Sequence, residues 1–270
     1  MPEQIEYQRA AYDGHYPKMA EAVRDQLAHP LLSSFYDRLA GLILDGLPVS
    51  GATGDASTRQ GEAKRHRLLE AGCGEGLLAT AVQRVAASRE IDVAYTGTDL
   101  SAAGIDLARS GVDGTFVHGD AVEVVSLMES GSHDLIWAKN LLHHLEDPAE
   151  FLRQATRVVG PRGRVVVVEP RMWCPVHWVN LMWFRQERFL FRGYRRNSAA
   201  FAAAGCTVLR TTEFGWLPYE LALATRFGTP RRLLSVGPGR GLERITSVDD
   251  RLTGLLPDFA LYMVTVVQGV

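Results

Sequence analysis

Short apolar runs alternate with amphipathic segments through the middle of the chain, from residue 67 to residue 170. Apolar runs bounded by turn residues are typical of strands that are buried on both faces, as in a parallel sheet covered by helices. The segments between them repeat apolar residues at helical spacing. This alternation predicts an α/β domain with a parallel sheet. The candidate strands are Arg67–Ala71, Val93–Thr98, Gly114–His118, His133–Ala138 and Arg164–Glu169, and the helices between them are Leu77–Val85, Ala102–Arg109 and Pro148–Val159.

The helix predicted at Pro148–Val159 has the best-marked boundaries. Asp147 precedes it as an N-cap, Pro148 suits the first helical position, and Glu150 completes the spacing of a capping box. A Gly-Pro pair then stops the helix. The consecutive valines that follow, Val165–Val168, predict a central strand buried on both faces.

The two ends of the chain differ from the middle. Apolar residues from Leu31 to Ile43 recur at helical spacing, and an earlier helix is expected to begin near Pro17. A polar stretch rich in glycine follows and predicts a surface linker. Regularity is lost after Glu169, before two final strands. We therefore expect one domain over residues 1–270, made of an N-terminal cap (1–45), a linker (46–66), a core (67–170), two inserts (171–200 and 215–257) and final strands at Cys206–Phe214 and Phe259–Gln268.

Charge and cysteine content narrow the class of protein. There are 31 Asp and Glu against 29 Lys and Arg, so no overall field attracts a polyanion, and we expect no nucleic-acid partner. Cys73, Cys174 and Cys206 are odd in number and lack CxxC spacing, which favours a reduced, cytoplasmic protein without a metal site. The chain shows no signal-peptide pattern and no apolar run of about 18–20 residues, so we expect no integral membrane contact. No sequence feature indicates an oligomeric state.

A glycine-rich loop lies between the first predicted strand and the helix after it. Glu70 is followed by glycines at 72, 74 and 76, and glycine is needed where backbone turns tightly and approaches a ligand closely. Such a ligand would bind at the carboxyl ends of the strands, beside the helix N-terminus. The dinucleotide fingerprint GxGxxG requires glycine at position 77, which is Leu77 here. A P-loop motif is also absent, which argues against a nucleoside triphosphatase.

Together with three later segments, this loop resembles the motifs of the class I S-adenosylmethionine-dependent methyltransferases, in particular the small-molecule type that includes quinone-pathway enzymes. The resemblance covers about residues 67–170. It implies a doubly wound, Rossmann-like sheet of seven mostly parallel strands, in the order 3-2-1-4-5-7-6 with the last strand antiparallel. It also implies S-adenosylmethionine as cofactor, with S-adenosylhomocysteine as its product. The four motifs are Glu70-Ala71-Gly72-Cys73-Gly74-Glu75-Gly76, Gly97-Thr98-Asp99-Leu100, His118-Gly119-Asp120-Ala121 and Trp137-Ala138-Lys139-Asn140-Leu141-Leu142-His143-His144-Leu145.

The resemblance gives each motif a part of the cofactor. Asp99 lies 23 residues after Gly76, where its carboxylate would accept from both ribose hydroxyls; a helix-capping Asp is the alternative. Asp120 would accept from the adenine amino group, or would be an ordinary turn residue. Glu70 would accept from the methionine ammonium, directly or through water. The cofactor-binding residues so assigned are Glu70, Gly72, Cys73, Gly74, Gly76, Asp99, Leu100, Asp120, Ala121, Lys139 and Asn140.

A catalytic base is needed only if the acceptor must lose a proton. The candidates are His144, which would lie near the cofactor's methyl group, then His177 and Glu169. The alternative for the adjacent histidines is that this family carries such a pair simply as part of its motif.

The acceptor would bind beneath the segment after the fifth strand, where this family inserts its substrate cover. Aromatic and arginine residues over 171–196 would line an apolar, aromatic or acidic acceptor. A helical hairpin packed on the sheet with a solvated polar face is the first alternative, and peripheral membrane contact is the second. Tyr12, Asp13 and Tyr16 would close over the cofactor. The candidate substrate-binding residues are Tyr12, Tyr16, His143, Trp173, Trp178 and Trp183.

The expected function is methyl transfer to an O, N or C nucleophile of a small-molecule metabolite by in-line displacement. Much of the rate would come from holding donor and acceptor about 3–3.5 Å apart in a dry site. One alternative is a nicotinamide-dependent oxidoreductase, which Leu77 and the later motifs disfavour. The other is a protein that binds the same cofactor without transferring its methyl group.

Overall fold

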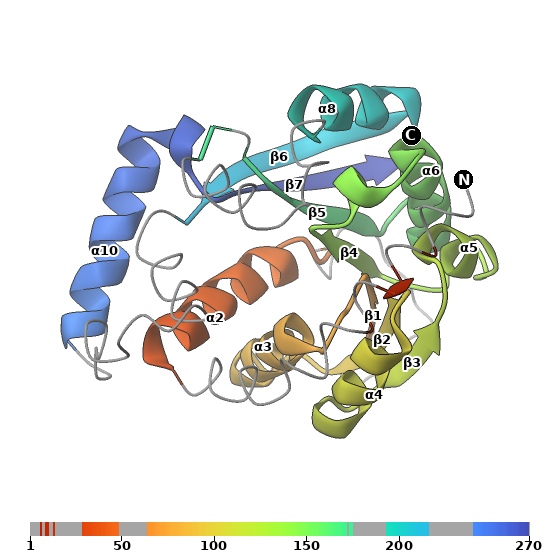
Figure 1. Cartoon of the computed structure of the whole chain (residues 1–270), viewed down its shortest axis with the longest axis horizontal. Coiled ribbons are helices and arrows are strands. Elements are labelled where there is room, and N and C mark those ends of the chain that lie inside the picture. Colours follow the sequence, from red (N-terminus) through yellow and green to blue (C-terminus); the bar gives the residue numbers. More distant parts are fainter. Residues whose placement is uncertain are drawn as a thin grey trace.

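The computed structural model describes residues 6, 9, 10, 13, 29–48, 64–171, 173–174, 193–215 and 240–269 (Figure 1). In this part of the chain, seven strands form one sheet in the order β3-β2-β1-β4-β5-β7-β6. Neighbouring strands are parallel except for β7, which runs antiparallel to both β5 and β6. The predicted topology is therefore confirmed. The strands are β1 (His66–Ala71), β2 (Val93–Asp99), β3 (Thr115–His118), β4 (Leu135–Lys139), β5 (Arg164–Pro170), β6 (Cys206–Phe214) and β7 (Tyr262–Gly269).

Some strand boundaries differ from those predicted. The fourth strand begins at Leu135 rather than His133, because the Asp134 carboxylate accepts hydrogen bonds from Lys64 and from the backbone of Arg67 as the chain enters the sheet. The last strand begins after position 259, because Pro257–Phe259 forms a 3-10 turn (η5). The third strand lacks Gly114, and the expected linker ends one residue early because His66 already belongs to β1. Most of that linker lies outside the described residues.

Helices cover both faces of the sheet (Figure 1). On one face α2, α3 and α4 pack over Trp137 and Val166, and on the other α5, α6 and α8 pack over Ile136 and Val165. Because alternate residues of β4 and β5 enter opposite cores, the apolar runs of both strands are buried throughout. The helices are α2 (Pro30–Leu44), α3 (Leu77–Ser88), α4 (Ala102–Gly111), α5 (Ala121–Ser126), α6 (Pro148–Val159), α8 (Gly193–Ala203) and α10 (Arg240–Leu255), with a further 3-10 turn η1 (Leu142–His144).

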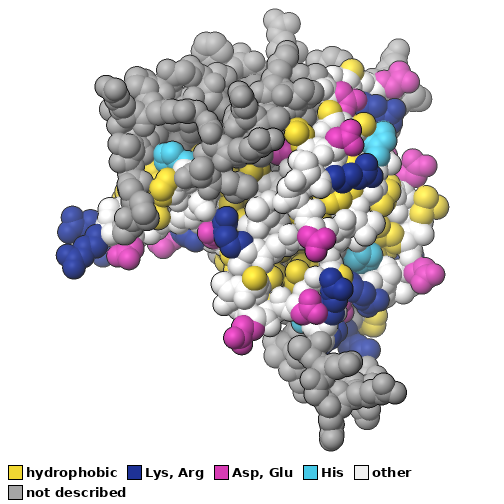
Figure 2. Space-filling view, turned by 90° about the horizontal axis from the view of Figure 1, so that it is seen from below, with side chains coloured by type: hydrophobic (Ala, Val, Ile, Leu, Met, Phe, Trp, Pro, Cys, Tyr) yellow, Lys and Arg dark blue, Asp and Glu magenta, His cyan; other side chains and the backbone are white. Residues whose placement is uncertain are grey.

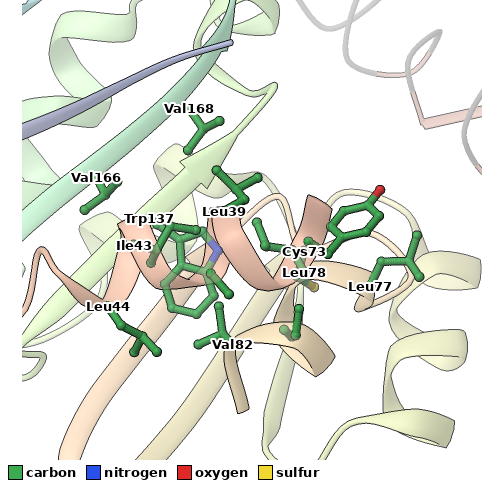
Figure 3. Packing of buried hydrophobic residues seen from close by; sticks show 14 of the residues in the cluster. Leu39, Ile43, Leu44, Cys73, Leu77, Leu78, Val82, Trp137, Val166 and Val168 are labelled. Atoms are coloured by element: carbon green, nitrogen blue, oxygen red, sulfur yellow. The ribbon is translucent and has the colours of Figure 1, made fainter. Parts of the chain in front are cut away.

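The helical stripe predicted in the N-terminal segment belongs to α2. Its apolar side chains pack against Trp137 together with Val82 of α3 (Figure 3). Trp137 is fully buried, as are Leu39 and Ile43 of α2. This contact fixes α2 to the central strands, so the segment before the core is joined to the same hydrophobic interior. The earlier helix expected near Pro17 lies outside the described residues.

Basic and acidic side chains are interspersed on the face of the molecule shown in Figure 2. That distribution matches the near-balance of charges in the sequence and provides no single-signed patch on the described part of this face. None of the described helices combines the length and the apolar character that crossing a bilayer requires.

The cap of α6 provides a test of the fold. The Asp147 carboxylate accepts hydrogen bonds from the backbone N–H groups of Ala149 and Glu150, each at 3.0 Å. Asp147→Ala leaves both donors without this partner, so we expect a loss of about 1 kcal/mol in the free energy of unfolding. Thermal denaturation measures it. Asp147→Asn keeps a capping oxygen and should lose much less; equal losses in the two variants would contradict the capping role.

Candidate functional site

The carboxyl ends of β1, β2, β4 and β5 meet at one edge of the sheet. β1 lies between β2 and β4, so the connections from β1 and β4 depart to opposite sides there. Gly72 and Cys73 donate backbone hydrogen bonds to Thr98 at 2.8 and 2.9 Å, which join the loop after β1 to the end of β2. Asn140 donates to the carbonyl of Val168 at 2.9 Å and joins the loop after β4 to β5. This is the position in an open α/β sheet where ligands bind.

All three glycines of the loop after β1 adopt conformations that other residues rarely take, and the first, Gly72, has a φ of 75°. Gly74 has a φ of 51°, and Gly76 has a φ of 82°. A Cβ on Gly76 would also lie 2.8 Å from a methyl group of Val112, so the loop could not pass this close to α4 with a larger residue. Leu77 begins α3 directly after this turn. The glycines therefore present a narrow strip of backbone at the N-terminus of α3.

Asp99, the last residue of β2, connects two of the loops. Its Oδ2 accepts from the N–H of Gly74 at 2.7 Å, and its Oδ1 accepts from the N–H of Ser101 at 2.8 Å. Burial raises the pKa of Asp99, and these hydrogen bonds oppose the rise. The cap of α4 is Ser101, whose hydroxyl accepts from Gly104 at 3.2 Å, so Asp99 is not the helix-capping residue considered as an alternative. Each carboxylate oxygen keeps a second lone pair for another donor.

Asp120 is the N-cap of α5 and lies next to the end of β2, because Gly119 donates to the carbonyl of Asp99 at 2.9 Å. Its Oδ1 accepts from the N–H groups of Val122 and Glu123 at 2.9 and 3.1 Å. Within the described residues the other oxygen has no hydrogen bond. Asp120 thus caps α5 with one oxygen and leaves the second available as an acceptor. Beside these two carboxylates lie the other residues assigned to the adenosine part, half-buried Leu100 and buried Ala121.

Glu70 is buried behind the glycine loop and accepts from the Tyr95 hydroxyl at 2.8 Å. Burial raises its pKa to about 8, although the hydrogen bond from Tyr95 opposes the rise. Glu70 is therefore mostly protonated at pH 7. Cys73 differs from the other loop residues, because its side chain lies in the hydrophobic core and burial raises the pKa of its thiol far above the ordinary range. Only its backbone belongs to the site.

The loop after β4 is held by Glu169 of β5. The Oε1 atom accepts from the N–H groups of Leu141 and Leu142 at 3.0 and 2.9 Å, and Oε2 lies 2.6 Å from Nδ1 of His143. Both side chains of the last pair are buried. Glu169 therefore holds the backbone of this loop, which argues against its predicted role as a base. His143 lies in the interior against Glu169 rather than at the surface where an acceptor would bind.

Asn140 and His144 flank this buried pair. Asn140 has a φ of 54°, an uncommon conformation for a residue other than glycine, and its Oδ1 is buried without a hydrogen-bond partner among the described residues. A buried acceptor without a donor requires a partner. Burial and, next, the neighbouring His143 lower the pKa of His144 well below its usual value. The His144 imidazole is therefore neutral at pH 7 and only a weak proton acceptor.

Lys139, assigned to the cofactor, directs its side chain elsewhere. Its Nζ lies 5.1 Å from the centroid of the Tyr262 ring in β7, across the end of β5. Tyr262 and Tyr95 were not among the candidate residues, because neither belongs to a motif. Only the folded sheet reveals that Tyr262 lies opposite the end of β5 and that the hydroxyl of Tyr95, from the middle of β2, reaches Glu70.

The remaining candidates are incompletely placed. Trp173 is 57% exposed after β5. Asp13 approaches the cofactor edge, because its carboxylate accepts from the Ser101 hydroxyl at 2.5 Å. No three His, Cys, Asp or Glu side chains converge as metal ligands within the described part of the chain. Tyr12, Tyr16, His177, Trp178 and Trp183 lie outside the described residues.

Comparison with known protein sequences gives a family match for the part of the chain that forms this edge of the sheet. Residues 69–167 match the family model described as "Methyltransferase domain". The chain is 33% identical over 138 residues to 27-O-demethylrifamycin SV methyltransferase of Amycolatopsis mediterranei, covering 48% of this chain and 42% of that protein. It is 31% identical over 100 residues to ubiquinone biosynthesis O-methyltransferase of Ralstonia nicotianae, covering 37% and 41%. These matches span less than half the length of the relatives.

Solved structures share the fold over more of the chain. A putative methyltransferase of Haloferax volcanii, in complex with the Trm112 methyltransferase activator, has a TM-score of 0.58 at 15% identity, covering 97% of this chain and 96% of that one. Geranyl diphosphate C-methyltransferase of Streptomyces coelicolor has a TM-score of 0.54 at 19% identity, covering 88% and 81%. Together, these results identify a methyltransferase domain in residues 69–167 of this chain, within a sheet whose fold is shared with solved methyltransferases.

Proposed function

We propose that this protein transfers the methyl group of S-adenosylmethionine to a nucleophilic atom of a small-molecule acceptor. The observation that carries the proposal is the set of acceptor atoms at one edge of the sheet: the carboxylates of Asp99 and Asp120, the Asn140 amide oxygen and Glu70. They lie beside the glycine-rich loop after β1, which is within the residues that match the family model.

The residues present fit this cofactor. A ribose, an adenine amino group and an ammonium all donate hydrogen bonds, and the site offers them oxygen acceptors. Asp99 would accept from the ribose, Asp120 from adenine through its remaining oxygen, and Glu70 with the backbone near Asn140 from the ammonium. When bound, the cofactor supplies an activated methyl group on a sulfonium. The protein's part is then to hold the acceptor in line and exclude water.

Two other functions are distinguished by experiment. A nicotinamide-dependent enzyme would bind a dinucleotide, but Leu77 replaces the last fingerprint glycine. The fold also resembles that of a [4+2]-cyclase, SpnF, with a TM-score of 0.51 at 19% identity, so fold alone does not establish methyl transfer. Incubation with methyl-labelled cofactor and a panel of phenols, quinols, amines and hydroxy acids tests it. Label in no acceptor, together with tight binding of NAD, would refute the proposal.

We also propose that the whole chain works as one domain in the cytoplasm. Helices from both ends support this, since Arg38 of α2 donates to the buried Asp249 of α10 at 3.2 Å. No disulfide joins Cys73, Cys174 or Cys206 in the described part of the chain, which supports a reducing compartment. The acceptor is taken to be a small molecule, with neither nucleic acid nor integral membrane as partner.

Asp99→Ala tests the placement of the ribose. The substitution removes the carboxylate and its hydrogen bonds, so affinity for S-adenosylhomocysteine should fall by roughly ten- to a hundredfold. Titration calorimetry measures the loss, and thermal denaturation confirms that the variant is folded. Asp106→Ala, an exposed carboxylate on α4, is the matched control and should bind like the wild type. Unchanged affinity in Asp99→Ala would show that the ribose binds elsewhere.

The raised pKa of Glu70 leads us to expect that a proton is released when the cofactor binds. With a pKa of about 8 it is largely protonated at pH 7, and a bound ammonium favours its ionised form. Affinity for S-adenosylhomocysteine should therefore rise as pH increases from 6 to 8, with roughly one proton released per ligand at pH 7. Calorimetry in phosphate and in Tris measures the release. Glu70→Gln should abolish it, and equal release in both proteins would exclude Glu70 as the source.

Glu169→Gln separates a base from a residue that holds the loop. A glutamine oxygen still accepts from Leu141 and Leu142, so the variant should keep methyl transfer within about tenfold, with an unchanged pH profile of kcat. Glu169→Ala leaves buried N–H groups unsatisfied, at roughly 1–3 kcal/mol each in the free energy of unfolding. If Glu169→Gln instead abolishes turnover while folding normally, Glu169 is the base.

A further inference from the structure

Lys139 places a positive charge at the acceptor side of the site. It is the last residue of β4, and its half-buried side chain reaches over the end of β5 to the Tyr262 ring of β7. The glycine loop lies on the opposite side of β4 from β5, because it follows β1. Lys139 also lowers the pKa of Glu70, so the two charges influence each other across this edge. The ammonium therefore lies between the cofactor residues and the antiparallel end of the sheet.

Among the described residues Lys139 has no hydrogen bond and no ion pair. Other cations are paired: Arg171, after β5, lies 2.7 Å from Asp258, and Lys64, at the opposite edge of the sheet, lies 2.9 Å from Asp134. A contact with an aromatic face satisfies none of the three N–H donors of an ammonium. A partly buried cation without an anion is costly, and an oxygen anion on a ligand would supply the missing partner.

Among the described residues of the site, Lys139 provides a cation, whereas the carboxylates and His144 are poorly suited to remove a proton from the acceptor. The Glu169 carboxylate is occupied by two backbone N–H groups and His143. Burial lowers the pKa of His144, which weakens it as a proton acceptor. Glu70 faces Tyr95 behind the loop. An acceptor hydroxyl must nevertheless lose its proton before or during attack, and a neighbouring ammonium lowers the pKa of such a hydroxyl.

We propose that Lys139 binds the acceptor as an oxygen anion, and that the acceptor is an aromatic hydroxyl compound held as its phenolate. This inference rests on the proposed function. The phenol loses its proton to water. Its oxygen then forms a bond to the methyl carbon as the carbon–sulfur bond breaks and leaves its electron pair on sulfur. The product is a neutral ether, which no longer pairs with Lys139 and can leave. Lys139 itself keeps its proton throughout.

A phenol that changes colour on ionisation tests the inference without knowledge of the natural acceptor. 4-Nitrophenol is titrated into the protein saturated with S-adenosylhomocysteine, and its absorbance is followed against pH. We expect the pKa of the bound phenol to fall by about 1 to 2, as for a group beside an opposite charge. Lys139→Met should abolish the fall. Lys64→Met is the matched control and should retain it, while 4-nitroanisole, which cannot ionise, should bind wild type and Lys139→Met equally.

Three outcomes would overturn the inference while leaving the proposed function intact. The wild-type complex could fail to bind 4-nitrophenol, or could bind it without a fall in pKa. Lys139→Met could retain the fall. Thirdly, Lys139→Met in the Glu70→Gln background could lose affinity for S-adenosylhomocysteine, which would assign the ammonium to the carboxylate of the cofactor. If the wild type does not bind S-adenosylhomocysteine at all, the proposed function itself fails.

Discussion

Backbone N–H groups at the carboxyl edge of the sheet need acceptors, because the chain leaves the strand ladder there and helices have not yet begun. Two buried carboxylates meet this need. Asp99 accepts from the loop after β1 and from the turn after β2, and Glu169 accepts from the loop after β4. Without them, buried donors would be left unsatisfied in each loop. The geometry of the whole site follows from these contacts, since they set the positions of both loops.

The same carboxylates explain what could be learned from the sequence and what could not. The sheet order was implied by the family resemblance that the four motifs carry, and the N-terminal bound of α6 follows from local signals in Asp147 and Pro148. Short elements such as α5 and η1 were not predicted, because too few residues are present for a periodicity. The sequence does not distinguish an acidic residue that accepts hydrogen bonds from the backbone from one that removes a proton from a substrate. Only the folded loop shows that Glu169 does the former.

Side-chain direction is the other part that sequence leaves open. Lys139 belongs to the motif after β4, which the resemblance relates to the cofactor, yet its ammonium lies over Tyr262. That contact depends on β7 running antiparallel beside β5, with Tyr262 opposite Pro170. The two residues are far apart in the chain, and neither carries a signal of the other. Tyr95 and Glu70 meet in a similar way, through the pairing of β2 with β1.

The antiparallel strand has a consequence for how this molecule tolerates change. Because β7 reverses direction, β6 ends and β7 begins at the same edge as the site, and Leu261 donates to the carbonyl of Gly215 at 2.9 Å to tie the two ends together. The connection from β6 to β7, which includes α10, therefore starts and ends at neighbouring points of the sheet. The entropy of closing such a loop grows only slowly with its length. Lengthening this connection should therefore cost little in the free energy of unfolding, while the strands of the sheet stay unchanged.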